Sequence, residues 1–204
     1  MKIRHGLLIV LEGIDGSGKT TQARSLLRRL RSRGWEAVFF REPSRGKWGR
    51  EIKRKAARAD SLTPPDELAL FVKDRRENVE KNLKPALRKG KVVVLDRYYF
   101  STIAYQGAKG IDPRRIRRMN EAFAVKPGLV IILDIAAGEG LARIAGRKTR
   151  DELFEREDYL ARVAKIFKNF RGPGILHLDG RGDRLSVGRA IWARVATLLP
   201  ARRT

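Results

Sequence analysis

The sequence predicts an α/β fold, a three-layer arrangement in which helices cover both faces of a five-stranded, mostly parallel sheet. Two observations lead to this prediction. Short apolar runs alternate along the chain with longer helical segments, and the glycine-rich pattern GIDGSGKT stands directly between the first apolar run and the first helical segment. No linker, low-complexity tract or internal repeat divides the 204 residues, so we expect a single domain over residues 1–204.

Five apolar runs have the length of strands, and helical segments fill the gaps between them. Strands are predicted at residues 7–12, 36–40, 91–95, 129–134 and 174–178. Helices are predicted at residues 19–33, 64–88, 113–123, 138–146, 152–170 and 184–199. Pro64 and Pro113 stand where the first turn of a helix tolerates proline, and Gly34 and Gly90 stand where glycine ends a helix.

The pattern from Gly13 to Thr20 fills every specified position of the phosphate-binding loop (P-loop), GxxxxGK[ST]. In such a loop, backbone N–H groups and the positive end of the following helix hold phosphate oxygens. Lys19 would reach the terminal phosphates of a nucleotide, and Thr20 would ligate magnesium. The residues expected to bind the nucleotide phosphates are Gly13, Ile14, Asp15, Gly16, Ser17, Gly18, Lys19, Thr20 and Thr21.

Two charged motifs, REP at residues 41–43 and DRY at residues 96–98, follow the second and third predicted strands. Because the carboxyl ends of parallel strands meet at one edge of a sheet, both motifs are expected beside the P-loop. Asp96 can hold magnesium, and Arg97 offers a planar fork to a second phosphate group. An N-cap role for Asp96 and a surface ion pair for Arg97 stay open. Asp134 also ends an apolar strand, but no arginine follows it, so Asp96 is preferred.

The formal net charge of +23 suggests a nucleic-acid partner, but the basic residues are dispersed along the chain with few aromatic residues between them. This dispersal favours solvated helix surfaces and anionic substrates over nucleic-acid binding. A nucleic-acid-dependent P-loop ATPase and a nucleotide-binding regulator without enzymatic activity remain alternatives from other classes. The apolar runs are too short to cross a bilayer, so we expect a cytoplasmic protein with no membrane partner.

Beyond the P-loop, the sequence resembles the thymidylate kinases, which transfer the terminal phosphate of ATP to thymidine monophosphate (dTMP). The segments that carry the resemblance are GIDGSGKTTQ, REP, LFVKDRR and DRYYFSTIAYQG, in the family's order and spacing. With DELFEREDYL it covers nearly the whole chain, and it is strongest toward archaeal and thermophilic bacterial members. The resemblance implies the P-loop NTPase fold of nucleoside monophosphate kinases, Mg²⁺ as cofactor and a homodimer to which the segment 64–88 can contribute.

The resemblance also implies how the acceptor nucleotide is bound. Asp15 would hydrogen-bond the sugar 3′-hydroxyl, and Arg97 would grip the acceptor phosphate. Phe71 would stack on the thymine ring, and Arg75, one helical turn later, would reach a ring carbonyl. Tyr105 would crowd the 2′ carbon and disfavour ribonucleotides. The full set implied for the acceptor is Asp15, Arg41, Glu42, Pro43, Phe71, Arg75, Arg97, Ser101, Thr102, Tyr105 and Gln106.

The stretch RIAGRKTR resembles the lid that closes over ATP in these kinases, here around residues 143–152. Some members carry an arginine at the P-loop position that Gly16 occupies, and the others supply that charge from the lid. The resemblance therefore implies that Arg147 or Arg150, with Arg143 behind them, stabilises charge on the transferred phosphoryl group. A solvated helix end is the plainer interpretation. The residues expected to act in catalysis are Lys19, Asp96, Arg97, Arg147 and Arg150.

One segment departs from the family pattern. Many members read GGT after REP, whereas this chain has SRGKWG at residues 44–49, including Trp48. Because this loop approaches the acceptor, a nucleoside monophosphate kinase with broader or shifted acceptor specificity is the alternative within the same reaction class. The adenine is expected near residues 178–183, and His177 is assigned a structural role.

Overall fold

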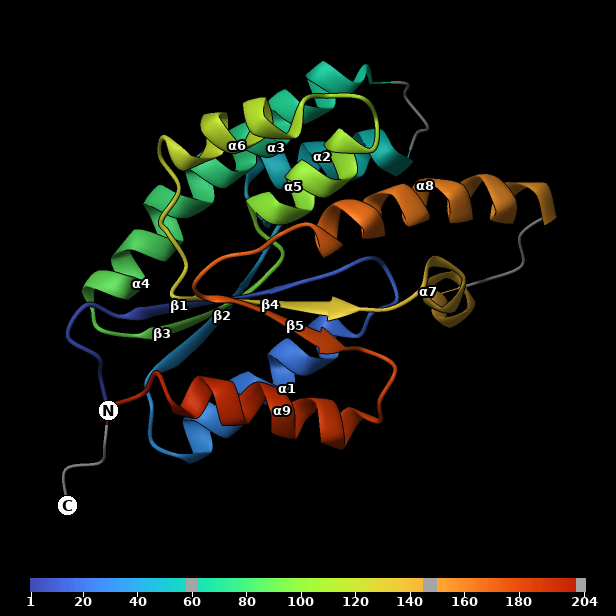
Figure 1. Cartoon of the computed structure of the whole chain (residues 1–204). Helices are drawn as coiled ribbons and strands as arrows, with labels where there is room; N and C mark the ends of the chain where they lie inside the picture. The colour runs from blue at the N-terminus through green and yellow to red at the C-terminus, as the bar shows by residue number, and fades with distance from the viewer. Residues whose placement is uncertain (58–61, 145–149, 201–204) are drawn as a thin grey trace.

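The structure is a computed structural model that describes residues 1–57, 62–144 and 150–200, with the side chains of residues 57 and 150–156 outside that description. Its sheet has five parallel strands in the order β2-β3-β1-β4-β5 (Figure 1). The strands are β1 (Leu7–Glu12), β2 (Ala37–Arg41), β3 (Val92–Asp96), β4 (Leu129–Asp134) and β5 (Ile175–Asp179). The predicted α/β class and five-stranded parallel sheet are confirmed.

Helices cover both faces of the sheet. They are α1 (Lys19–Ser32), α2 (Lys47–Ala57), α3 (Pro64–Asn78), α4 (Lys84–Arg88), α5 (Tyr99–Gly107), α6 (Pro113–Glu121), α7 (Ala137–Ile144), α8 (Arg150–Lys168) and α9 (Arg184–Ala196), with a π-helical turn, η1 (Val79–Leu83), between α3 and α4. Helices α1 and α9 lie on one face, and α3, α4, α5, α6 and α8 lie on the other (Figure 1). In the described residues, no helix has the length and apolar character needed to cross a membrane.

Alternation along the strands divides the core into two clusters. In β1, Leu8 and Val10 pack with the cluster under α5 and α8, whereas Ile9 and Leu11 pack with the cluster under α1 and α9. All four side chains are buried, as expected for a central parallel strand covered on both faces. This burial fixes β1 in the middle of the sheet and places the P-loop at its carboxyl end.

Two helices, α2 and α5, were absent from the elements predicted from sequence. Helix α5 is buried on nearly every side, so its apolar sequence has no polar stripe that indicates a helix. Helix α2 lies in the departing segment, where glycines interrupt the helical pattern. Gly49 is required there, because a Cβ atom at this position would lie 2.1 Å from the Ser44 carbonyl oxygen.

Candidate active site

The P-loop joins β1 to α1 through glycines in the left-handed region, Gly16 at φ 80° and Gly18 at φ 86°. Gly18 is the N-cap of α1 and supplies no side-chain cap, so the first N–H groups of the helix face the loop. A Cβ atom at Gly16 would lie 2.1 Å from the carbonyl oxygen of Gly140 in α7. An arginine at position 16 is therefore excluded by the backbone of α7.

Lys19 is 5% exposed, and its Nζ donates a hydrogen bond to the Ile14 carbonyl oxygen at 2.8 Å. Burial and, next, the nearby charge of Arg97 lower the pKa of Lys19 to about 7, although the carboxylates of Asp15, Asp96 and Glu12 act to raise it. The side chain of Lys19 is thus folded back over the loop, close to the positively charged Arg97. A phosphate group placed in the loop would favour its protonated form.

Asp96 ends β3 at a fully buried position beside the P-loop helix. Thr20 Oγ1 donates to Asp96 Oδ2 at 2.6 Å, and Arg41 Nε lies 3.7 Å from the same oxygen. Asp96 Oδ1 and the hydroxyl of Ser17 are buried without a hydrogen-bond partner. Hydroxyl and carboxylate oxygens are the ligands that Mg²⁺ prefers, so Thr20 and Asp96 fit this cation. Asp96 does not cap α5, whose N-cap is Tyr98.

Asp134 lies elsewhere. Its carboxylate contacts His177 Nδ1 at 2.7 Å between β4 and β5, while His177 Nε2 lies 2.9 Å from the carbonyl oxygen of Phe170. These contacts join the edge strand to the end of α8 and agree with the structural role expected for His177. The geometry therefore favours Asp96 over Asp134 beside the P-loop.

Arg97 connects the P-loop to α5. Its guanidinium group pairs with Asp15, donates to Ser101 Oγ at 2.9 Å and lies 5.1 Å from the ring centroid of Tyr105. Tyr105 in turn accepts a hydrogen bond from the Asp15 backbone N–H at 3.1 Å. Burial acts to raise the pKa of Asp15, but the charges of Arg97 and Lys19 hold it below the usual value. An ion pair between P-loop and acceptor residues is thus already formed.

Within the described residues, Arg97 is the one non-glycine residue with positive φ, at 71°. This conformation costs roughly 1–2 kcal/mol for an L-residue and is concentrated at functional sites. The Arg97 backbone N–H donates to the Leu11 carbonyl oxygen at 3.0 Å, which holds the strained residue against β1. The backbone geometry independently supports a functional role for Arg97.

Glu12, the last residue of β1, was missed in the sequence. It is fully buried, and its carboxylate accepts hydrogen bonds from the backbone N–H groups of Tyr98 at 2.7 Å and Ser101 at 3.2 Å. The Ser101 hydroxyl also donates to it. Burial raises the pKa of Glu12 to about 7 despite these bonds and the charge of Arg97. The signal available in the sequence was a carboxylate closing the apolar run LLIVLE.

Arg75 lies in α3 with only 1% of its surface exposed. Its nitrogens contact Glu42 at 2.8 Å, Asn120 at 2.6 Å and Thr102 at 2.9 Å. Asn78 also donates to Glu42, at 3.1 Å. Asn78 and Asn120 are further residues of this cluster that the sequence did not indicate. Arg75 is consequently held rigidly beside Thr102, one helical turn after the half-buried Phe71.

The far side of the acceptor region joins α3, α5 and α8. Gln106 Nε2 donates to Glu67 at 2.8 Å, and Lys109 also pairs with Glu67. The side-chain oxygen Oε1 of Gln106 is buried and has no hydrogen-bond partner. Tyr159, in α8, donates to the backbone oxygen of Tyr105 at 2.9 Å. Helix α8 is therefore tied directly to Tyr105 of α5.

The departing loop is anchored on α3. Asp74 accepts hydrogen bonds from the Ser44 backbone N–H at 2.8 Å and from its hydroxyl at 2.5 Å. The ring of Trp48 lies between the ammonium groups of Lys47 and Lys73, each 4.8 Å from its centroid. Asp74 precedes Arg75, so adjacent residues of α3 hold Ser44 and the neighbouring REP motif. The loop at residues 44–49 is thus anchored by the same turn of α3 that carries Arg75.

The donor side closes over the P-loop through Arg143, at the end of α7. Its Nη1 donates to the Gly180 carbonyl oxygen at 3.1 Å and to the Gly16 carbonyl oxygen at 3.4 Å. Arg147 lies outside the described residues. Arg150 begins α8, and its side chain is outside the description too. Of the three lid arginines, Arg143 is therefore the one whose contacts place it beside the P-loop.

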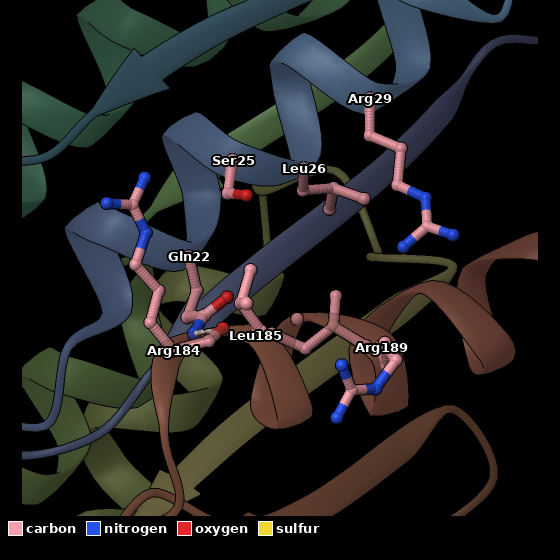
Figure 2. Close-up of a pocket in the computed structure, with 9 residues that line it drawn as sticks. Gln22, Ser25, Leu26, Arg29, Arg184, Leu185 and Arg189 are labelled. Atoms are coloured by element: carbon pink, nitrogen blue, oxygen red, sulfur yellow. Dashed lines mark hydrogen bonds between the residues drawn. The ribbon is translucent and has the colours of Figure 1, made fainter.

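Gln22, in the segment GIDGSGKTTQ, links α1 to the start of α9. Figure 2 shows its amide donating to the Arg184 carbonyl oxygen, at 3.0 Å. The cavity beside this bond measures about 110 Å³, well below the roughly 300–1,000 Å³ of a nucleotide-sized pocket. The bond from Gln22 therefore ties α1 to the start of α9, directly after residues 178–183.

Comparisons with known proteins agree with this geometry. The profile of the family described as "Thymidylate kinase" matches residues 11–180. The chain is 45% identical over 199 residues to a thymidylate kinase of Akkermansia muciniphila, covering 98% of this chain and 94% of the relative. It is 43% identical over 197 residues to one of Xanthomonas campestris, covering 97% and 86%, and 47% identical over 161 residues to a probable thymidylate kinase of Archaeoglobus fulgidus, covering 79% and 80%. The chain belongs to the thymidylate kinase family.

Proposed function

We propose that the residues at the carboxyl edge of the sheet divide the family's reaction, transfer of the γ-phosphate of ATP to dTMP, between a donor half and an acceptor half. The observation that carries this proposal is the contact between Arg97 and Asp15, since it joins the P-loop to the acceptor helix. Asp15 thereby belongs to both halves. An acceptor phosphate bound by Arg97 lies next to a donor phosphate bound by the loop.

In the donor half, the P-loop N–H groups and Lys19 hold the β- and γ-phosphates. Lys19 exchanges its hydrogen bond to the Ile14 carbonyl oxygen for bonds to these phosphate oxygens, because a charged phosphate attracts the ammonium group more strongly than a peptide carbonyl does. Arg143 secures the loop at residues 178–183, on which the adenine rests. Phosphoryl transfer requires positioning and charge stabilisation rather than a covalent nucleophile.

Thr20 and Asp96 would hold Mg²⁺, since their oxygens lie together and Asp96 Oδ1 is free to accept a further contact. When bound, the ion would neutralise charge on the donor phosphates. Arg41 also contacts Asp96, and its side chain is about half-exposed. We assign it to assist Arg97 in binding the acceptor phosphate. A dTMP phosphate oxygen then attacks the γ-phosphorus as its bond to the departing ADP oxygen breaks.

In the acceptor half, Asp15 receives the sugar 3′-hydroxyl and Tyr105 borders the 2′ carbon. Nε and Nη2 of Arg75 contact Glu42 and Thr102, and Nη1 donates to Asn120, so the second N–H of Nη1 is the one that can meet a base carbonyl. Phe71 supplies the stacking surface, while Ser101, Thr102 and the unpaired oxygen of Gln106 line the pocket with Glu42 and Pro43. These roles follow the family resemblance and agree with the contacts described above.

For the remaining parts, we propose that Arg147 and Arg150 close over the transferred phosphoryl group, and that the protein acts as a cytoplasmic homodimer. The exclusion of a side chain at position 16 supports the first assignment, because the charge has to come from outside the P-loop. The family resemblance supports the homodimer, with the segment 64–88 as a candidate contributor to the contact between subunits. Light scattering on the purified protein measures the subunit number.

The proposed reaction is tested by ADP release from Mg-ATP with a panel of nucleoside monophosphates. We expect dTMP to give the highest kcat/KM, with dUMP, dCMP and AMP well below it. Lys19→Ala provides an inactive control that shows release is due to this site. A different preferred acceptor would assign the loop at residues 44–49 a role in specificity. Turnover independent of any acceptor would refute the proposal.

A further inference from the structure

Helix α5 has no cap of its own. Its N-cap residue, Tyr98, makes no side-chain capping bond. Instead, Glu12 reaches across from β1 and accepts the N–H groups of Tyr98 and Ser101, at the N-cap and third helical positions. In an ordinary capping box, two residues of the helix itself satisfy these positions. Here a single carboxylate at the base of the P-loop performs both tasks.

The same carboxylate extends to Arg97 through a side chain. The Ser101 hydroxyl donates to Glu12, and Arg97 Nη1 donates to the Ser101 oxygen at 2.9 Å. The Arg97 backbone is held by Leu11, the neighbour of Glu12. Both the strained backbone of Arg97 and its guanidinium group are therefore positioned by the last two residues of β1. The register of the sheet makes this possible, since Leu11 pairs with Asp96.

In the hydrogen bonds that connect Glu12 to Arg97, the Glu12 carboxylate acts as the acceptor. All of its partners donate hydrogen, so each oxygen has to accept. Arg97 and Lys19 are the positive groups that interact with it. An amide at this position would keep the shape of the side chain, but it would replace one acceptor oxygen with an N–H₂ donor and remove the negative charge. The negative charge of the carboxylate therefore favours the connection to Arg97.

We propose that Glu12 is a positioning residue that holds Arg97, through Ser101 and the start of α5, in the conformation that receives the acceptor phosphate. This inference rests on the proposed role of Arg97. Glu12 itself is fully buried at the end of β1, and its hydrogen-bond partners are Tyr98 and Ser101. Its effect therefore falls on the acceptor side, although it belongs to the strand that carries the donor loop.

The test compares Glu12→Gln, Ser101→Ala and the double variant with wild type, using steady-state kinetics and titration calorimetry with dTMP alone. Each single change should raise the KM and the Kd for dTMP about tenfold, the loss of one charge-assisted hydrogen bond. The KM for ATP should change less than about twofold. Because both residues act through one connection, the double variant should bind dTMP about as tightly as the weaker-binding of the two single variants.

Asp112→Ala is the matched control. It removes an N-cap from α6, where Asp112 accepts from two backbone N–H groups, and lies away from the P-loop. It should lower the melting temperature and leave the KM for dTMP unchanged. Glu12→Gln with the same profile as this control, or effects of Glu12 and Ser101 that multiply, would overturn the inference.

Ser101→Ala keeps the backbone cap, so it tests the connection even where Glu12→Gln fails to fold. In that case an unchanged Kd for dTMP in Ser101→Ala overturns the proposal. The wild-type assay separates the two levels of argument. Wild type without dTMP-dependent turnover refutes the proposed function, whereas an active wild type with an unaffected Glu12→Gln variant refutes the role of Glu12 alone.

Discussion

Replacing Arg75 by methionine should destabilise the protein by about 3–5 kcal/mol, because the buried carboxylate of Glu42 loses its counter-charge. The side chains of Arg75 and Glu42 are 1% and 3% exposed, and their charged atoms lie 2.8 Å apart. Methionine also leaves the buried oxygens of Asn120 and Thr102 without the donors they use now. The free energy of unfolding in urea, measured without nucleotide, gives the effect directly.

The deficit of this variant should depend on pH. Burial raises the pKa of Glu42 above the free value of 4.5, and the charge of Arg75 offsets part of that effect. Without Arg75 the carboxyl pKa rises further, so the ionised side chain destabilises the folded state at high pH. Below the unfolded pKa the group is neutral in both states and this penalty disappears. The deficit relative to wild type should thus be larger at pH 8 than at pH 5.

Lys81→Met is the matched control, because it removes a cation from an exposed pair. Lys81 lies 2.7 Å from Glu77, but its side chain is 70% exposed, so about 0.3–0.5 kcal/mol is expected, with little pH dependence. The double variant of Arg75→Met with Glu42→Gln should recover part of the lost stability. A deficit below about 1 kcal/mol for Arg75→Met, or one equal at both pH values, would refute the reasoning.

Three further predictions concern the donor half. Asp96→Asn should raise the Mg²⁺ concentration for half-maximal turnover at least about tenfold, as a Mg²⁺ titration at saturating nucleotides would measure, since a neutral amide binds the cation less well. Alanine at both Arg147 and Arg150 should lower kcat by orders of magnitude with nucleotide Kd values nearly unchanged; unchanged kcat in single-turnover experiments would remove them from catalysis. Because the pKa of Lys19 is lowered to about 7, ATP binding should take up a proton at pH 8 and much less at pH 6. Calorimetry in buffers of different ionisation heat measures this uptake, and equal values at both pH values would contradict the assignment of Lys19.

The sheet and the P-loop were predictable because their signals are local. Each strand is an apolar run bounded by turn residues, and the glycine pattern specifies a loop that few other residues can form. The same patterns failed for α2 and α5. Burial on nearly all sides removes the polar stripe of α5, so neighbouring helices, rather than its own sequence periodicity, stabilise it as a helix.

The DRY motif indicated Arg97 and the family resemblance indicated Arg75, but the partners of both residues could not be found in the sequence. Asn120 is 45 positions from Arg75, and Glu12 is 86 positions from Tyr98. Neither residue carries a local motif, and each is an ordinary polar side chain until another element is packed against it. Such residues become visible only when the donors and acceptors around a buried charge are known.

By itself, the sequence determined the strand and helix alternation, the phosphate loop and the charged residues that end β2 and β3, since these depend on contacts between near neighbours in the chain. The tertiary structure decided which of these residues meet. Parallel pairing places Leu11 opposite Asp96 and Asp96 opposite Arg41, and this register alone brings Glu12, Arg97 and Asp15 into one connected group. The physical reason is that a buried carboxylate is stable only with donors around it, and those donors come from distant segments whose positions the packed sheet determines.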